Sequence, residues 1–445
     1  MNKKRVIVID VPGLSLNHVM SKGLMAHSNS LMSNGHVYRM RTVFPAVTLP
    51  VQASLTTGVS PEEHGVVSNG FYFPDSHQIS FWEQAASLVE AERIWDRLKR
   101  RDAGIKTATL FFQNTLYAQC DAVITPRPMH TDEGLIQWCY SKPVGLYEEI
   151  CSSIGEFDLT HYWGPMASIK SSQWISKASI EVAARIKPDL MFVYLPHLDY
   201  CMQKLGPDHP GVEMELSLVD NEIGRIVQGV NDLGLEGETI FIILSEYVFS
   251  GVAGDIAINR ILRENGLLSV RSIKGREYLD LELSPAFAMA DHQIAHIYIK
   301  PGREKSVRQV LEKTDGIDYV LDADGKKDHK IAHPRSGDII AVSAKDRWFS
   351  YYWWFDREKE PDFAAHVDIH RKPGYDPLEL FIEPGTFKIS QDTSLIRGSH
   401  GYPAISQDQM TVLLISGHIP DRIKVPDGPV ITDVSGVIET ILTGD

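Results

Sequence analysis

The chain has 445 residues, of which 43% are hydrophobic and 23% charged, and its formal net charge is −14. This composition is typical of a folded globular protein, and the length predicts either one large domain with insertions or two domains. The negative charge argues against nucleic acid or an anionic membrane as a partner. A small phosphorylated metabolite remains possible, because a metal ion or a local group of donors can outweigh the net charge at one site.

The cysteines and the N-terminus indicate the compartment. Cys120, Cys139, Cys151 and Cys201 show no CxxC spacing, so reduced thiols in a reducing compartment are the simplest interpretation. The apolar run at residues 6–9 is far too short for a signal peptide or a membrane span. We therefore expect a cytoplasmic protein in which this run is the first buried strand.

Short apolar runs alternate along the chain with amphipathic stretches. Runs rich in Val and Ile, without polar alternation, favour strands covered on both faces of a parallel sheet. We predict such strands at residues 5–10, 104–110, 188–196 and 238–245. Three- and four-residue spacing of apolar residues predicts helices at 81–101, 172–186, 211–234 and 255–268. This βα alternation predicts a doubly wound α/β fold with a mostly parallel central sheet and helices on both faces.

Two stretches interrupt the alternation. Residues 111–165 and 346–395 are rich in aromatic residues, Pro and His, and we interpret them as cap-like insertions in a single catalytic domain that spans residues 1–445. Insertions of this kind often cover a site at the carboxyl ends of the strands. The run "WFSYYWWF" (348–355) could stack on a ligand, but aromatic residues at this density more often belong to a core.

Acidic residues follow three of the predicted strands. Asp10 ends the first, His197 and Asp199 follow the third, and Glu246 with Tyr247 follows the fourth. Because parallel strands end at the same edge of a sheet, three carboxylates should meet there, where they repel one another unless a cation binds or some are protonated. For each residue alone, capping or an ion pair is the simpler explanation, but together they favour a divalent metal site.

The motifs "VIVIDVPGL", "FPAVTLPVQASLTTGVSPEEHGVVSN", "VYLPHLDYCMQKLGP", "IILSEY" and "GSHGYP" occur in this order. Their combination resembles the type I phosphodiesterase/nucleotide pyrophosphatase family, which has an alkaline-phosphatase-like core. The resemblance implies that Thr48 is the nucleophile, that Asn69 holds a phosphoryl oxygen, and that Asp10, Thr48, Asp199 and His400 bind metal. It also implies attack by a metal-bound threonine alkoxide, a covalent phospho-enzyme and hydrolysis by water.

The sequence departs from the family pattern at two metal-ligand positions. Gln203 replaces a histidine, and Glu246 with Tyr247 replaces an Asp-His pair. Because Gln and neutral Tyr are weak ligands, strong binding of two zinc ions is not expected. The resemblance implies one or two divalent ions per chain, which are zinc in the family. The altered, oxygen-rich ligands make manganese, magnesium or iron the alternatives.

Other polar residues could complete the site. Further candidate metal ligands are His197, Gln203, Tyr247, Asp291 and His292. His197 would lie on the same side as Asp199 if the chain were extended there, whereas His292 could simply cap a strand. Candidate substrate contacts beside Asn69 are Arg127, His370, Arg371 and Asp376. Arginine pairs well with phosphate, but surface charge or a turn explains the same residues.

Together these observations predict a metal-dependent hydrolase of a small phosphate ester, of phosphodiesterase or phosphatase type, with Thr48 as nucleophile. The alternatives are a catalytically inactive ligand-binding member of the same fold, in which Gln203 and Tyr247 mark lost metal ligands, and a phosphonate hydrolase. A homodimer is compatible with the sequence.

Overall fold

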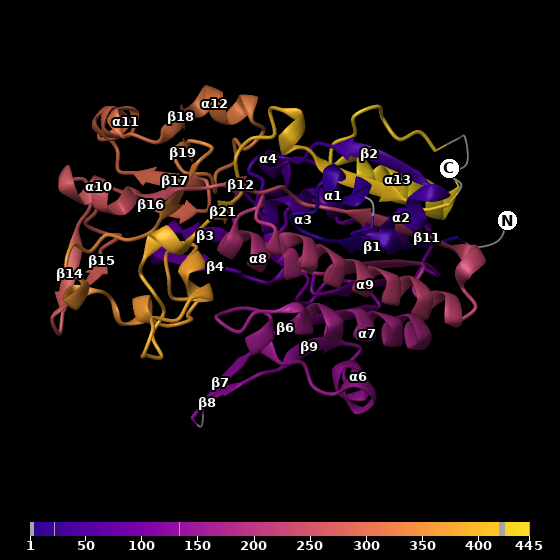
Figure 1. Cartoon of the computed structure of the whole chain (residues 1–445). Coiled ribbons are helices and arrows are strands. Elements are labelled where there is room, and N and C mark those ends of the chain that lie inside the picture. Colours follow the sequence, from indigo (N-terminus) through magenta and orange to yellow (C-terminus); the bar gives the residue numbers. More distant parts are fainter. Residues whose placement is uncertain (1–3, 22, 133, 418–422, 445) are drawn as a thin grey trace.

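The computed structural model describes residues 4–21, 23–132, 134–417 and 423–444. Its central feature is an eight-stranded sheet (Figure 1). Its strands in spatial order are β2 (His36–Met40), β22 (Thr411–Ile415), β11 (Thr239–Leu244), β1 (Arg5–Asp10), β10 (Leu190–Tyr194), β5 (Thr107–Leu110), β6 (Ala122–Pro126) and β9 (Cys139–Lys142). The five strands from β11 to β6 run parallel, and antiparallel neighbours flank them on both sides. The predicted mostly parallel α/β fold is therefore confirmed.

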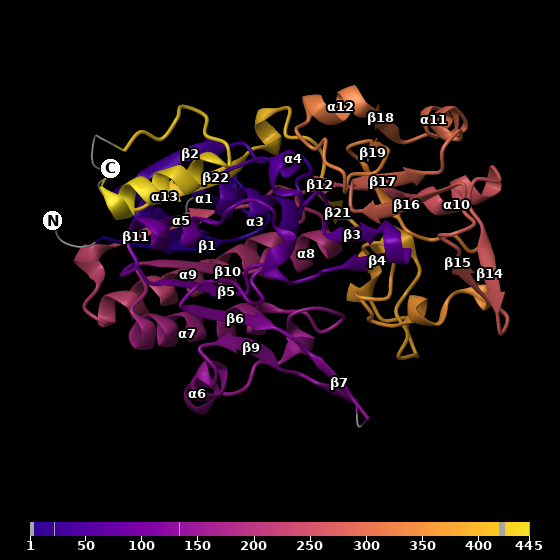
Figure 2. The ribbon, with the colours of Figure 1, turned by 180° about the vertical axis from the view of Figure 1, so that it is seen from behind.

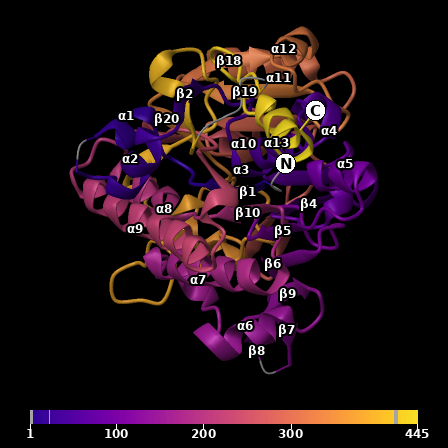
Figure 3. The same cartoon turned by 90° about the vertical axis from the view of Figure 1, so that its right-hand side faces the viewer.

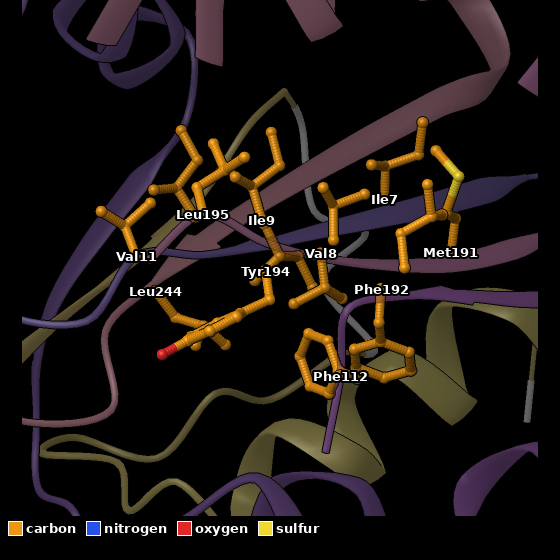
Figure 4. Packing of buried hydrophobic residues seen from close by; sticks show 14 of the residues in the cluster. Ile7, Val8, Ile9, Val11, Phe112, Met191, Phe192, Tyr194, Leu195 and Leu244 are labelled. Atoms are coloured by element: carbon orange, nitrogen blue, oxygen red, sulfur yellow. The ribbon is translucent and has the colours of Figure 1, made fainter. Parts of the chain in front are cut away.

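The middle strands are buried on both faces, as their unbroken apolar sequences predict. Figure 4 shows Val8 of β1, Phe192 of β10 and Phe112 after β5 packed together. In the parallel register Asp10 lies opposite Tyr194 and Leu244. The three strands therefore end at one level, and the segments that follow them start from the same edge of the sheet.

Helices cover both faces of the sheet (Figures 2 and 3). On one face α13 (Asp433–Thr443) packs on β1 and against α3 (Thr48–Thr57) and α5 (Ile94–Arg101). On the other face α7 (Ile169–Ile186) packs on β10 and β5 and against α8 (His197–Leu205) and α9 (Gly211–Asp232). Of the shorter helices, α1 (Leu16–Met20) contacts β22, α2 (Ala26–Ser33) contacts α9, α4 (Pro61–His64) contacts α3, and α6 (Leu146–Ile154) contacts α7.

Two predicted helices are shorter than expected. The helix predicted at 81–101 begins only at Ile94, because Gln78–Phe81 forms β4, which pairs with β3 (Gly70–Phe73), and Trp82 has a left-handed φ of 61°. The helix predicted at 255–268 is α10 (Ile258–Glu264), because Gly254–Ala257 forms β13 and pairs with β20 (Arg347–Ser350). Strand pairing overrides the local helical spacing in both segments, through the hairpin with β3 in the first and the distant strand β20 in the second.

The interpretation of 111–165 as an insertion is wrong in part. Residues 122–126 and 139–142 are β6 and β9 of the central sheet, and only the hairpin of β7 (Met129–Thr131) and β8 (Gly134–Ile136) projects from it (Figure 1). A β6 strand that is buried yet ends in proline, followed by a short edge strand, gives no long apolar run in the sequence.

A second hydrophobic core lies beside the central sheet, around a four-stranded antiparallel sheet. This sheet contains β16 (Ala286–Asp291), β17 (Ile294–Ile299), β19 (Ile339–Ser343) and β18 (Ile317–Leu321), with α11 (Glu304–Lys313) and α12 (Ala323–Asp328) nearby. The small pairs are β12 (Ser250–Gly251) with β21 (Gly398–Ser399) and β14 (Val270–Ile273) with β15 (Arg276–Leu279). Residues 346–395 belong to this larger unit, and the aromatic residues of 348–354 are part of its core.

No helix in the described part of the chain is long and apolar enough to cross a membrane.

Candidate active site

Thr48 is the first residue of α3, and its side chain is buried at the end of the central sheet. Its Oγ1 lies 3.1 Å from the hydroxyl of Tyr247. The N-terminal end of a helix carries a partial positive charge and favours a bound anion. The hydroxyl is therefore placed where a phosphoryl group would be stabilised.

Asn69 is fixed by contacts at both ends of its amide. Its Oδ1 accepts a hydrogen bond from the backbone N–H of Leu49 at 2.9 Å, and its Nδ2 donates to Asp291 at 3.1 Å. The amide is thus oriented next to the nucleophile by α3 on one side and by the second sheet on the other. One hydrogen of Nδ2 faces Asp291, which leaves the other as a donor for a ligand.

Asp291, a candidate metal ligand, is instead surrounded by hydrogen-bond donors. Oδ2 accepts from Ser68 Oγ at 2.7 Å and from the Asn69 backbone N–H at 2.8 Å, and Oδ1 lies 2.7 Å from His292 Nδ1. Although burial opposes ionisation, the His292 ring and the backbone N–H of Asn69 hold the pKa of Asp291 below its ordinary value. This carboxylate positions Asn69 and His292.

Asp10 and Glu246 form a buried pair of carboxyl groups beside Thr48 and Gln52. Gln52 Nε2 donates to Asp10 Oδ2 at 3.4 Å. Among the described residues, Asp10 Oδ1 and both Glu246 oxygens meet no hydrogen-bond donor. Burial raises the pKa of Asp10 to about 8, and burial together with the Asp10 charge raises the pKa of Glu246 well above its ordinary value. Two such carboxylates cannot both ionise without a cation.

Asp199 lies in a closed hydrogen-bonded network. Its Oδ1 accepts from the Tyr247 hydroxyl at 3.1 Å, and its Oδ2 accepts from Gln203 Nε2 at 2.6 Å. Gln203 Oε1 in turn accepts from the Tyr375 hydroxyl at 2.8 Å. Burial raises the pKa of Asp199 to about 6. Both positions that depart from the family pattern therefore donate hydrogen bonds to this one carboxylate.

Four rings stack in a column beside Asp199. Tyr247 stacks on His400 at 3.6 Å between ring centroids, and His292 stacks on Tyr375 at 3.7 Å. The rings of His400 and His292 lie 3.8 Å apart between centroids and are tilted by 37°. His400 Nδ1 lies 2.8 Å from the carbonyl of Ala46, to which it donates, and burial lowers the pKa of His400 well below its ordinary value. The neutral ring directs Nε2 toward Asp199 Oδ1, 3.6 Å away.

The donor atoms fit a cation beside Asp10 and Glu246 better than beside Asp199. No group of three or more His, Cys, Asp or Glu side chains that could hold a metal occurs in the part of the chain that the structure describes. Asp10 and Glu246 nevertheless offer three unpartnered buried oxygens, with the Thr48 hydroxyl beside them. Oxygen ligands of this kind suit a hard ion such as Mg²⁺ or Mn²⁺.

A sequence profile described as type I phosphodiesterase/nucleotide pyrophosphatase matches residues 6–376. The chain belongs to this family. The assignment confirms the resemblance seen in the motifs around Thr48 and His400.

Curated relatives of the family match at low identity. An uncharacterized pyrophosphatase/phosphodiesterase of Schizosaccharomyces pombe is 21% identical over 273 residues, which are 61% of this chain and 49% of the relative. The rat ectonucleotide pyrophosphatase/phosphodiesterase family member 1 is 24% identical over 230 residues, 51% of this chain and 22% of the relative. The chain thus spans about half or less of the length of these relatives.

Solved structures share the fold over nearly the whole chain. An inactive variant of murine ectonucleotide pyrophosphatase/phosphodiesterase 5 in complex with AMP superimposes with a TM-score of 0.65 at 16% identity, covering 99% of this chain and 95% of that one. Phosphonoacetate hydrolase from Sinorhizobium meliloti, in complex with phosphonoformate, gives a TM-score of 0.62 at 16% identity, covering 98% and 96%. At this identity the likeness establishes the fold alone.

Most residues that the family motifs predict meet in this structure, but His197 does not join them. His197 begins α8, and its Nε2 lies 2.5 Å from Glu215 Oε2 on α9. The expectation that it shares a side with Asp199 is wrong, because the segment is helical and residues two apart point in different directions.

The predicted substrate contacts are engaged elsewhere. Arg127 is exposed and lies over the ring of Tyr117, and His370 Nδ1 faces the carbonyl of Phe81. Arg371 pairs with Asp362 and Asp368 on the surface. Asp376 pairs with the buried Lys372 at 2.8 Å. The structure does not bring these four side chains together beside Asn69.

Three residues of the site were not predicted: Gln52, Ser68 and Tyr375. Gln52 lies one helical turn after Thr48, so a helix starting at Thr48 would have placed it on the same side. Ser68 adjoins Asn69. Tyr375 reaches Gln203 from 172 residues away in sequence, and no local pattern indicates such a contact.

Proposed function

We propose that the chain hydrolyses the phosphate ester of a small metabolite, with a divalent cation as cofactor and Thr48 as nucleophile. The observation that carries the proposal is the position of Thr48, at the start of α3, hydrogen-bonded to Tyr247 and beside Asp10 and Glu246. Three of the four oxygens of these two carboxyl groups have no hydrogen-bond partner among the described residues. Membership of the family supports the same chemistry.

In the first step Thr48 Oγ1 forms a bond to phosphorus while the bond from phosphorus to the leaving oxygen breaks. The Tyr247 hydroxyl lies 3.1 Å from Thr48 Oγ1 and 3.1 Å from Asp199 Oδ1, so it can pass the threonine proton to Asp199. The leaving oxygen takes a proton from water. Asn69 Nδ2 donates to a phosphoryl oxygen and stabilises its charge.

In the second step water hydrolyses the phosphothreonine, and the Thr48 hydroxyl is restored with a proton returned through Tyr247. A divalent cation held by Asp10 and Glu246 would balance their charge and lower the pKa of the Thr48 hydroxyl. A threonine hydroxyl is a poor nucleophile at neutral pH without such activation.

The test is hydrolysis of bis-p-nitrophenyl phosphate, p-nitrophenyl phosphate and phosphonoacetate by protein stripped of metal, with Mg²⁺, Mn²⁺, Fe²⁺ or Zn²⁺ restored singly. We expect cation-dependent turnover of a phosphate ester that disappears in Thr48→Ala. Thr57→Ala is a matched control, since Thr57 lies at the other end of α3 and its hydroxyl bonds the carbonyl of Ala53 and the N–H of Val59.

Trapping the reaction with acid should give a chain heavier by one phosphoryl group, located on Thr48 by mass spectrometry. Full turnover in Thr48→Ala would refute the proposed nucleophile. Turnover of phosphonoacetate alone would favour phosphonate hydrolysis, for which the shared fold of the phosphonoacetate hydrolase is the supporting observation.

A further inference from the structure

The two acidic positions of the site differ in how their oxygens are satisfied. Asp10 Oδ1 and both Glu246 oxygens are buried and have no hydrogen-bond partner among the described residues. Both oxygens of Asp199, in contrast, accept hydrogen bonds from Tyr247 and Gln203. A buried carboxylate must be neutralised or hydrogen-bonded. Of these three carboxyl groups, only Asp199 has both of its oxygens hydrogen-bonded within the described part of the chain.

The hydrogen-bond donors around Asp199 are held in their orientations by neighbouring residues. The Gln203 amide is oriented by Tyr375, whose hydroxyl bonds Oε1 and leaves Nε2 facing Asp199. The Tyr247 ring stacks on His400 with 5° between the ring planes. Tyr375 stacks on His292 at the other end of the same column. The two tyrosines and the glutamine are therefore held in place by the packed rings.

Little remains around Asp199 to coordinate a metal. Its Oδ1 and the Nε2 of His400, 3.6 Å apart, are two ligand atoms, and the first already accepts from Tyr247. Four ligands are needed for a tetrahedral zinc site. The Gln203 oxygen is occupied by Tyr375. A cation at this position would have to displace a hydroxyl from the stacked column.

We propose that the hydrogen-bonded network of Asp199, Gln203, Tyr247 and Tyr375 takes the place of a second metal ion, so that the chain binds a single divalent cation, at Asp10 and Glu246. This inference rests on the proposed function for the role of the cation. It assigns Asp199 to accepting hydrogen bonds, and through Tyr247 to positioning the Thr48 hydroxyl.

The experiment counts bound metal and does not depend on turnover. Protein stripped by chelation is equilibrated with Mn²⁺ or, separately, Zn²⁺, and the ions per chain are measured by elemental analysis after removal of free metal. We expect one Mn²⁺ per chain in the parent protein and in Asp199→Asn. Glu246→Gln should lose it, because even partners outside the ligand shell are worth about 10–100-fold in affinity. Glu215→Gln, which alters a carboxylate that faces His197, is the matched control and should keep it.

Each outcome of the metal analysis either supports or overturns the inference of a single cation. Two ions per chain would overturn the inference, as would loss of the ion in Asp199→Asn with retention in Glu246→Gln. Absence of any bound ion from the parent protein would also overturn it, whereas the proposed nucleophile is judged separately by Thr48→Ala. Asp→Asn and Glu→Gln preserve side-chain volume, and circular dichroism checks that each variant is folded.

Discussion

Replacing Asp291 by asparagine should show whether this carboxylate positions Asn69 and His292 or binds a metal ion. Asparagine keeps one acceptor oxygen and puts an amide group in place of the other. If the amide replaces Oδ2, Ser68 and the Asn69 backbone N–H lose their acceptor, and if it replaces Oδ1, Asn69 Nδ2 and His292 lose theirs. Two hydrogen bonds to a charged group, at about 1.5–3 kcal/mol each, correspond to a loss of about 3–6 kcal/mol in the free energy of unfolding.

Asp291→Asn should also lower the rate of catalysis without weakening the binding of the cation. Asn69 would lose its anchor on one side, and a displacement of about 1 Å in a positioning group can cost about 100-fold in rate. The assay combines urea unfolding followed by tryptophan fluorescence, initial rates, and Mn²⁺ titration of Asp291→Asn. Asp280→Asn is the control, because this buried carboxylate pairs with Arg271 away from the site, so it should lower stability and leave the rate intact. Unchanged stability together with a large loss of Mn²⁺ affinity would refute the reasoning and make Asp291 a metal ligand.

Two further outcomes are expected. Tyr247→Phe keeps the ring that stacks on His400 but removes the hydroxyl between Thr48 and Asp199. We expect kcat to fall about 10-fold or more with KM unchanged. Steady-state kinetics with an unaltered kcat would contradict the proton transfer through Tyr247. Burial lowers the pKa of His296 to about 4. As the pH falls, the unfolded chain therefore takes up a proton at this histidine before the folded chain does. The contribution of His296 to the free energy of unfolding is fully present above about pH 6.5 and falls by about 3 kcal/mol as the pH approaches 4. Urea midpoints at pH 7 and 4.5 test this, and His296→Gln should show a weaker pH dependence than the parent.

The sequence predicts the middle of the fold well, because its strands are buried on both faces and their residues are uniformly apolar. The runs at 5–10, 188–196 and 238–245 contain β1, β10 and β11 with boundaries within a few residues. The edge strand β9 pairs with β6, and the hairpin strand β4 pairs with β3. Their formation depends on this pairing, which the local pattern of each strand does not show. The helix predicted from residue 81 fails for this reason.

In the candidate site too, residues in local motifs are predictable from the sequence, whereas contacts between distant segments are not. Asp10, Thr48 and Glu246 were placed together because each sits at a strand end or in a recognisable motif, and the structure brings them to one edge of the sheet. In the sequence Asp291 is only a candidate metal ligand. In the structure it accepts hydrogen bonds from Ser68 and Asn69, which lie 223 and 222 residues away. A carboxylate that binds metal and one that accepts hydrogen bonds look alike in a sequence, because the difference lies entirely in what surrounds them.

The departures from the family pattern are best understood as parts of one arrangement. Gln203 alone would have an undirected amide, but the Tyr375 hydroxyl fixes its oxygen and turns its N–H group to Asp199. Tyr247 supplies the second donor to the same carboxylate and also reaches Thr48. Oriented neutral donors can stabilise a buried carboxylate in place of a cation. It follows that restoring a histidine at position 203 alone would leave Tyr247 on Asp199, and a second metal ion would require both positions to change together.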